Sequence, residues 1–436
     1  MDSFWFWAYL ALAGLALLQA GLLAVQTWEH RRYARSCMRA IDRLHASGHA
    51  QVFAPCKGVD VELEGNLRAV LQQDYHDYEV TFVVETEDDP ACEVIHRLAA
   101  ENPQTPTRLV VAGRADQCGQ KVHNLRAATA KLAPQTAYLA FVDSDARPRP
   151  QWLRTLVARL GQGDLGAVTG YRWFTPQRDS LANHLLYSTN CDVMSLFGQS
   201  SHYLTWGGSW TIRRDVFESI GLRDAWRGTL SDDLIASREL CRARRRVRFE
   251  PVGVVASPVD HTMRQMFSFI RRQYIVGRYY VPGWWLFAVA AATFTAAVWV
   301  GSLVAILTGL LYGTPPTWIP VSVFTVLYLL SVQRGMVRQD LVDVYFPGRR
   351  RKLRNAMRVD VWLSPVVAVV NWVAVSASLF GRSISWRGIR YGLARGGQIR
   401  SLVREDELQP TVTEQTDERP EPGDVVREFP TYRKTG

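Results

Sequence analysis

Several common ligand-binding patterns are missing from this sequence. It contains no GxxxxGK[ST] run and no GxGxxG run, which argues against a P-loop protein and against a dinucleotide-binding domain. Its six cysteines form no CxxC pair and show no zinc-type spacing, which favours reduced thiols in a cytosolic setting. The net charge is +10 without an aromatic-basic RNA motif, so a nucleic acid is not an expected partner. No internal repeat is evident.

Basic residues are also missing before the first apolar run. Only Asp2 precedes the uncharged stretch 4–25, whereas HRRYAR, with Arg31 and Arg32, follows it directly. A cleaved signal peptide would carry its basic residues on the other side. We therefore expect residues 1–30 to form an uncleaved membrane anchor whose carboxyl end lies in the cytoplasm.

Three further apolar stretches lie in the expected membrane region, 282–393. They cover residues 284–311, 318–332 and 361–380. Residues 334–358 carry eight basic and two acidic side chains, which predicts a cytoplasmic loop. Four full spans would place both ends of the chain outside. Either the first stretch hides a break, or 361–380, interrupted by Pro365, is re-entrant or interfacial. The basic residues that follow favour a cytoplasmic carboxyl end, and the number of spans stays open.

Residues 48–281 alternate between short apolar runs and helical segments. The predicted strands are QVFAPC, YEVTFVV, TRLVVAG and AYLAFV, and a predicted helix follows each of them. Four consecutive βα units predict an α/β domain with a doubly wound, mostly parallel sheet. The final residues, 401–436, contain four prolines and few bulky apolar groups, which predicts a disordered tail.

Polar side chains follow three of these strands where each strand ends. Asp88 and Asp89 follow the second strand, Lys121 follows the third, and Asp143 and Asp145 follow the fourth. Ligands bind at this edge of an open α/β sheet, and hard divalent cations combine a carboxylate or two with phosphate oxygens. The pattern predicts a site for a metal-bound phosphorylated ligand. For an isolated DxD, a solvated turn in which Asp145 caps the next helix is the simpler interpretation.

Several short motifs occur in a characteristic order. They are PCKGVD (55–60), QDYHDYEV (73–80), DDPA (88–91), KVHNL (121–125), VDSD (142–145), SDDL (231–234), RRQY (271–274) and SWRGIRY (385–391). With these motifs the chain resembles membrane glycosyltransferases of the family 2 type, most closely the ceramide glucosyltransferase branch. The resemblance implies a GT-A fold over 48–281, a UDP-sugar donor, a divalent cation (Mn²⁺ or Mg²⁺) and inversion at the anomeric carbon.

The resemblance assigns donor-side roles position by position. Asp143 and Asp145 would hold the cation and, through it, the diphosphate. Lys121 would meet the diphosphate as a point charge, and Asp89 would lie near the base and ribose of the nucleotide. Two simpler readings remain open, because Asp89 can cap the helix that begins at Pro90 and Lys121 can be a solvated lysine of a first helical turn.

Acceptor-side roles come from the same comparison. Asp233 would be the general base that takes the proton of the acceptor hydroxyl, with Asp232 in the place of a glutamate, although one of this pair can cap the next helix. Trp206 and Gly208 would line the acceptor side, since glycine allows a close approach to the backbone. A core tryptophan is the alternative for Trp206.

One motif departs from the family pattern. In FIRRQY, Gln273 and Tyr274 stand where the family has an arginine and a tryptophan. A contact of Gln273 and Tyr274 with donor or acceptor is therefore the least supported assignment, and Arg271, Arg272 or Arg278 can supply the missing charge from one turn away.

The expected activity is the metal-dependent, inverting transfer of a hexose, with glucose favoured, from a UDP-sugar to a lipid hydroxyl. The lipid would be ceramide-like or another membrane lipid, and the enzyme a multi-pass protein of the cell membrane with a cytoplasmic catalytic domain. Two alternatives stay open: a processive polysaccharide synthase, which would need a larger helical bundle, and a non-catalytic membrane scaffold that retains the fold.

Overall fold

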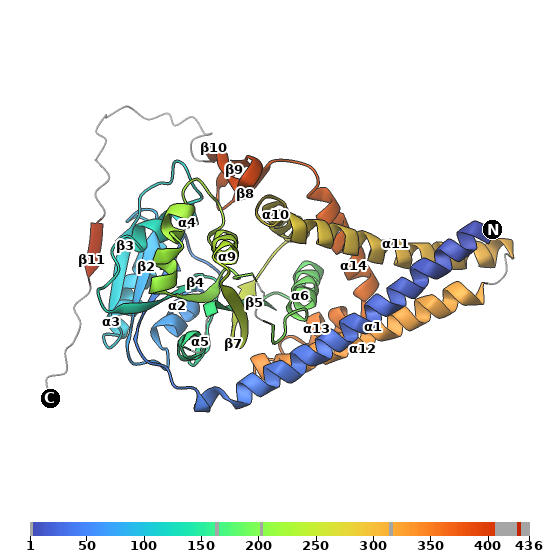
Figure 1. The fold of residues 1–436 in the computed structure, drawn as a ribbon, viewed down its shortest axis with the longest axis horizontal. Helices are drawn as coiled ribbons and strands as arrows, with labels where there is room; N and C mark the ends of the chain where they lie inside the picture. Colours follow the sequence, from blue (N-terminus) through green and yellow to red (C-terminus); the bar gives the residue numbers. More distant parts are fainter. Residues whose placement is uncertain (1–2, 162–164, 201–203, 314–316, 406–424, 429–436) are drawn as a thin grey trace. The chain divides into compact units, whose positions relative to one another are not determined.

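The computed structural model describes residues 3–161, 165–200, 204–313, 317–405 and 425–428 (Figure 1). The chain divides into two compact units. The first unit comprises Met1–Ser36, Trp173–Gln199 and Val259–Phe380, and the second comprises Cys37–Arg172, Ser200–Pro258 and Gly381–Gly436.

The second unit is built on an eight-stranded sheet. Its strands are β1 (His49–Pro55), β2 (Tyr78–Val84), β3 (Thr107–Val111), β4 (Thr136–Val142), β5 (Leu165–Pro176), β6 (Ser209–Arg213), β7 (Arg246–Val259) and β11 (Val425–Glu428). Their order across the sheet is β11-β3-β2-β1-β4-β6-β5-β7. The helices between them are α2 (Leu63–Leu71), α3 (Ala91–Glu101), α4 (Gln120–Ala128), α5 (Trp152–Leu160), α7 (Arg214–Ser219), α8 (Leu222–Ala225) and α9 (Asp232–Arg242).

The four predicted βα units form the parallel part of the sheet. β1 pairs in parallel with both β2 and β4, and β2 pairs in parallel with β3. Every residue of β2 is buried, as expected for a strand whose two faces are both covered by helices. The chain runs outward from β1 through β2 to β3 and then returns to place β4 on the other side of β1. This change of direction between β1 and β4 is where an open α/β sheet holds its ligand.

The rest of the sheet was not predicted strand by strand. β6 pairs antiparallel with β4 and with β5, so a mixed region continues the parallel one. The predicted α/β class is confirmed, and the four predicted strands each appear in the sheet.

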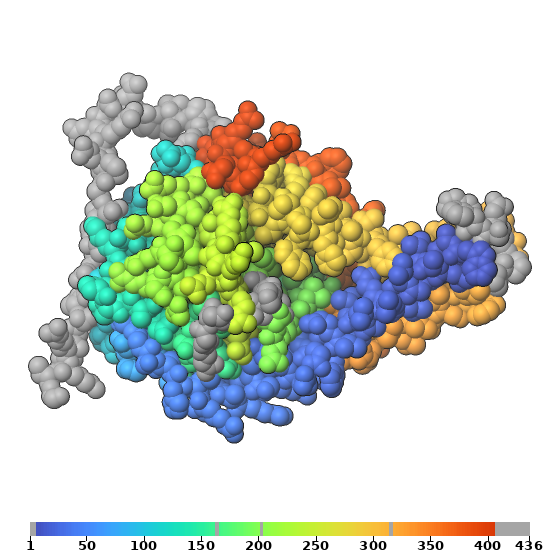
Figure 2. All heavy atoms as spheres, in the orientation of Figure 1, coloured from blue at the N-terminus to red at the C-terminus, as the bar shows by residue number. Residues whose placement is uncertain are grey.

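A small antiparallel sheet follows in the second unit. It consists of β8 (Ser383–Trp386), β9 (Ile389–Leu393) and β10 (Ile399–Arg404). Figure 2 shows this carboxyl-terminal sheet in red at the surface of the molecule. Residues 383–393, expected in the membrane region, form strands instead, and β10 includes the first residues of the segment expected to be disordered. Most of that segment, 406–424 and 429–436, lies outside the described residues.

The first unit is mainly helical. Its helices are α1 (Ser3–Arg39), α6 (Leu181–Met194), α10 (Met263–Tyr280), α11 (Pro282–Tyr312), α12 (Trp318–Tyr345), α13 (Arg354–Trp362) and α14 (Ser364–Ala377). Among the described residues, three helices are long and apolar enough to cross a membrane, namely α1, α11 and α12. They pack through buried side chains such as Ala13, Trp299 and Leu327. Large apolar side chains elsewhere on them, including Leu22 and Leu310, are exposed, as a lipid environment would require.

The last apolar stretch is not a straight helix. α13 and α14 bend by 84° at a short break, so together they are a broken span or a re-entrant loop. Pro365 lies in the first turn of α14, where its missing N–H and its fixed φ start a new helix direction. Residues 334–345 of the predicted basic loop belong to α12 instead.

Candidate active site

Two loops meet at the point where the strand order changes direction. Asp143 follows β4 directly, and Asp60 lies in the loop after β1. The hydroxyl of Ser144 donates to Asp60 Oδ2 at 2.6 Å. The PCKGVD and VDSD motifs are thus joined across the expected ligand crevice.

Lys121 joins two acidic motifs. It lies in the first turn of α4, and its Nζ is 2.7 Å from Asp143 Oδ1 and 2.9 Å from Asp232 Oδ1. Burial lowers the pKa of the Lys121 ammonium, but Asp143, Asp232 and Asp233 outweigh that effect and hold its pKa above the ordinary value. Lys121 is therefore a permanent cation between the strand end and the start of α9. It is not the solvated lysine of the alternative reading.

Arg172 on β5 bridges the two aspartates of the DxD motif. Its Nη1 is 3.3 Å from Asp143 Oδ2, and its Nη2 is 2.6 Å from Asp145 Oδ2. The same Nη2 donates to Ser257 Oγ at 2.8 Å. Arg172 was not among the predicted site residues. An arginine inside the strand run GYRWF was nevertheless a signal, because a strand with two covered faces rarely holds a charge without a partner.

The DxD carboxylates suit a divalent cation that shares its coordination with phosphate. Asp145 Oδ1 is buried and has no hydrogen-bond partner among the described residues. The described residues contain no group of three or more His, Cys, Asp or Glu side chains placed to hold a metal. Mg²⁺ and similar hard ions commonly take only one or two carboxylates and complete their shell with phosphates and water. The residues present fit such an ion bound together with a phosphorylated ligand.

The two aspartates of the SDDL motif have different surroundings. Asp233 accepts from Gly207 N at 2.7 Å and Leu234 N at 2.8 Å, and also from the hydroxyl of Ser231. Asp232 is 3% exposed, and its Oδ2 has no partner among the described residues. Burial raises the pKa of the Asp232 carboxyl to about 6, against the opposing charge of Lys121. Asp233 therefore contributes to capping α9, whereas the Asp232 carboxyl takes up a proton at a higher pH than an ordinary aspartate does.

Two consecutive glycines lie against this charged cluster. A Cβ on Gly207 would lie 2.9 Å from Asp233 Oδ2, and a Cβ on Gly208 would lie 2.8 Å from Arg172 Cδ. Gly208 also has φ +92°, which strains any other residue. The backbone therefore requires glycine at Gly208, and a side chain at Gly207 would displace the Asp233 carboxylate. The ring of the neighbouring Trp206 lies 4.7 Å from the Tyr171 ring, centroid to centroid. Trp206 is half-buried, so it is not a core tryptophan.

Asp89 makes the contacts of a helix cap. Its Oδ1 accepts from Ala91 N at 2.9 Å at the start of α3, and from Gly58 N at 2.9 Å in the loop after β1. The simpler reading of Asp89 is thus present in the structure. The same contacts fix the loop after β1 to the loop after β2, at the edge where a nucleotide would bind.

Gln273 and Tyr274 lie on α10 in the first unit. Gln273 is exposed, and Tyr274 donates from its hydroxyl to Asn371 Oδ1 at 2.6 Å. Arg271 donates to the carbonyls of Ala377 and Phe380, and Arg278 to those of Ser378 and Leu379. These two arginines donate to the last carbonyl groups of α14 and the residues after it, where positive charge is favourable. Both guanidinium groups are therefore already engaged in these hydrogen bonds.

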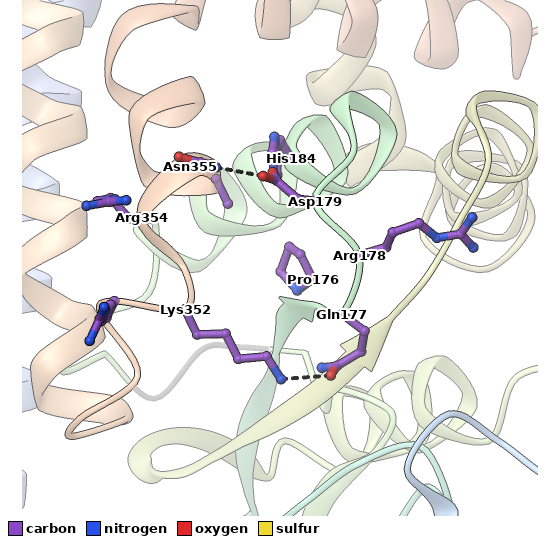
Figure 3. Close-up of a pocket in the computed structure, with 10 residues that line it drawn as sticks. Pro176, Gln177, Arg178, Asp179, His184, Lys352, Arg354 and Asn355 are labelled. Atoms are coloured by element: carbon purple, nitrogen blue, oxygen red, sulfur yellow. Dashed lines mark hydrogen bonds and ion pairs between the residues drawn. The ribbon is translucent and has the colours of Figure 1, made fainter.

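A pocket in the first unit contains none of the predicted site residues. It has a volume of about 140 Å³ and is lined by residues 176–179, His184 and residues around 351–356. Its walls are tied together, because Lys352 Nζ donates to Gln177 Oε1 at 2.9 Å and Asn355 Nδ2 donates to Asp179 Oδ2 at 2.7 Å (Figure 3). The site proposed for chemistry is the cluster of the second unit.

Comparisons with known proteins give one family match and two weak structural similarities. A family model described as glycosyl transferase family 21 matches residues 11–399. The mannosyltransferase PcManGT from Pyrobaculum calidifontis, solved with GDP-mannose and Mn²⁺, is 16% identical, with a TM-score of 0.39 over 81% of this chain and 99% of its own. GalNAc-T7 with UDP, GalNAc and Mn²⁺ is 10% identical, with a TM-score of 0.36 over 53% of this chain and 48% of its own. Similarities this weak carry no argument about ligands.

The family match extends over the α/β domain and over apolar helices on both sides of it in the sequence. The predicted GT-A type of fold with such helices is therefore confirmed. The match is to family 21, whereas the motifs suggested the family 2 type.

Proposed function

Because this chain belongs to glycosyl transferase family 21, we propose that it transfers a hexose, with glucose favoured, from a UDP-sugar to the hydroxyl of a ceramide-like or other membrane lipid. One observation carries the proposal. Four carboxylates and two partly buried cations converge at the edge of the sheet, namely Asp143, Asp145, Asp232, Asp233, Lys121 and Arg172. A structural role alone does not need so many charges beside a ligand crevice.

The donor side of this cluster is suited to a nucleoside diphosphate. Asp143 and Asp145 would hold a divalent cation, Mn²⁺ or Mg²⁺, which when bound supplies Lewis-acid stabilisation of the departing diphosphate. Lys121 is fixed beside Asp143 and offers its ammonium to the same diphosphate. Asp89 would keep the loop after β1 in place against the base and ribose.

The acceptor side needs a group that removes the proton of a hydroxyl. We assign this role to Asp233, whose Oδ2 lies beside the backbone of Gly207, with Trp206 and Gly208 lining the acceptor path. A positioned carboxylate typically contributes roughly 10²–10⁴ in rate. Asp232 is the competing candidate, because its free Oδ2 and its pKa of about 6 also suit a base. Gln273 and Tyr274 remain proposed donor or acceptor contacts.

The membrane helices supply the reason for a lipid acceptor. If α1, α11 and α12 each span the membrane and α13–α14 is re-entrant, both basic segments, at 31–35 and at 382–400, lie on one side. The positive-inside rule makes that side the cytoplasm. This topology supports a cytoplasmic GT-A domain over 48–281 in a multi-pass protein of the cell membrane.

Product analysis tests the proposal directly. The purified full-length protein in detergent is incubated with Mn²⁺, a panel of UDP-sugars and a total lipid extract, and the products are identified by mass spectrometry. We expect one lipid class to gain one hexose, and the Asp143→Asn variant to form none of it. Release of sugar only to water, or to a growing polysaccharide, would contradict the lipid acceptor.

A further inference from the structure

The tip of the β8–β9 hairpin carries an unusual residue. Arg387 and Gly388 form the two-residue connection, with φ +50° and +74°. Two-residue connections of this kind require positive φ at both positions and strongly prefer Asn, Asp or Gly at the first. An arginine in the left-handed region is strained, and such strain tends to persist where the side chain has a task.

The Arg387 side chain points to the proposed donor site. Its Nη2 lies 2.7 Å from Asp60 Oδ1 and 3.0 Å from Asp60 Oδ2, and its Nη1 donates to the carbonyl of Lys57. Asp60 also accepts from Ser144, which lies between the two aspartates of the DxD motif. Burial lowers the pKa of the Arg387 guanidinium, but Asp60, Asp145 and Asp143 together raise it above the ordinary value. The guanidinium is therefore within electrostatic reach of the proposed metal ligands.

The hairpin is fixed in this position by other contacts. Tyr391 on β9 accepts from Gln120 N at 3.3 Å, at the start of α4. Arg404 on β10 lies 2.5 Å from Glu85 Oε1, after β2, and its Nη2 donates to Gln120 Oε1 at 2.8 Å. The carboxyl-terminal sheet thus contacts the loops after β1, β2 and β3, and these contacts hold Arg387 at the crevice.

We propose that Arg387 is a donor-binding residue whose guanidinium leaves Asp60 and contacts the diphosphate of the bound UDP-sugar. This inference rests on the proposed function. Arginine presents a planar fork of N–H donors that matches phosphate oxygens. Its side chain is 31% exposed, so a ligand in the crevice can reach it. An incoming diphosphate carries more negative charge than the single carboxylate of Asp60. The guanidinium is therefore attracted more strongly to the diphosphate than to Asp60.

Substitution of the turn residue separates binding from folding. Arg387→Asn places a preferred residue at the positive-φ position, so the melting temperature in detergent should stay equal or rise. The affinity for UDP in the presence of Mn²⁺ should fall roughly ten- to a hundredfold, the usual worth of a charge-assisted hydrogen bond. The affinity for uridine, which has no phosphate, should not change. Arg387→Lys keeps the charge without the fork and should give an intermediate UDP affinity.

Arg390→Asn is the matched control, since Arg390 lies three residues away on β9, is exposed, and its side chain has no hydrogen-bond or ion-pair partner among the described residues. It should leave UDP and uridine affinities unchanged. A lower melting temperature for Arg387→Asn with an unchanged ratio of UDP to uridine affinity would show a purely structural residue and overturn the inference. Failure of the unaltered protein to bind UDP at all would overturn the proposed function itself, and the inference with it.

Discussion

Two clusters of buried charge, one in each unit, differ in how completely they are paired. In the first unit, Arg338 on α12 lies 2.8 Å from Asp360 Oδ1 through Nη2, and its Nε donates to Asp360 Oδ2 at 3.0 Å. Its Nη1 donates to Asp192 at 3.1 Å, and Gln339 donates to Asp360. Every nitrogen of the guanidinium and both oxygens of Asp360 have partners.

The cluster of the second unit contains carboxylate oxygens that accept no hydrogen bond from the described residues. Lys121 and Arg172 neutralise Asp143 and Asp145, yet Asp145 Oδ1 and Asp232 Oδ2 have no partner among the described residues. A buried acceptor without a partner is costly, and such cost is common where a ligand completes the site. The cluster of the first unit is therefore fully paired between helices, whereas the cluster of the second unit keeps two carboxylate oxygens unpaired within the described part of the chain, as we expect of a site that takes up a charged ligand.

The largest effect is expected at the proposed metal ligands. Asp143→Asn or Asp145→Asn should each abolish transfer, because the leaving diphosphate loses its cation. UDP affinity should fall much more in the presence of Mn²⁺ than in its absence. Product formation and calorimetric titration of UDP check this, and chelation with EDTA should imitate the variants. Full activity in excess EDTA would contradict the role of the metal.

The next effect concerns the stability of the first unit. Arg338→Leu leaves the buried Asp360 carboxylate with Gln339 but without the cation that it pairs with, and should cost roughly 3–5 kcal/mol of unfolding free energy. The double variant Arg338→Leu with Asp360→Leu should recover much of the loss, because no uncompensated charge remains. Thermal unfolding in detergent measures both. UDP affinity per folded molecule should stay constant, and a selective loss of UDP binding would show that this cluster also serves the ligand.

A smaller effect is expected at the proposed base. Asp233→Asn should lower turnover by about two orders of magnitude or more while UDP-sugar affinity stays nearly constant, since the base acts only on the acceptor. Asp232→Asn is the matched comparison and should reduce turnover less. If Asp232→Asn is the more damaging change, the base is Asp232, and equal loss of donor binding in Asp233→Asn would move that residue to the nucleotide site.

The smallest effect is a pH dependence of stability without ligand. Because burial raises the pKa of Asp232 to about 6, the folded state holds this proton more tightly than the unfolded state does. The resulting stability is complete below about pH 4 and is lost as the pH rises towards 6. Asp232→Asn removes this titration. The melting temperature of the variant relative to that of the unaltered protein should therefore be a few degrees higher at pH 7 than at pH 4.5. An equal difference at both pH values would mean that Asp232 is not perturbed.

Local pattern was sufficient for much of this protein. Alternating apolar and helical segments predicted the four βα units, and the end of each strand marked Lys121, Asp143 and Asp145 as neighbours, since parallel strands bring their carboxyl ends to one edge. The uncharged run before Arg31 marked α1 as a candidate span in the same way. These features depend on residues close together in the chain.

Long-range pairing decided the rest. Arg172 reaches the DxD motif only because β6 inserts antiparallel between β4 and β5, and Arg387 reaches Asp60 from 327 residues away. The basic residues after 380 indicated a cytoplasmic carboxyl end, but nothing in the run 383–393 indicated that Arg387 and Tyr391 would contact Asp60 and Gln120. The sequence alone determined which side chains gather where strands end, because strand ends follow from local periodicity. Only the tertiary structure decided which cations neutralise these carboxylates and which oxygens stay without a partner. Those contacts join segments that are far apart in the chain, and no local pattern indicates them.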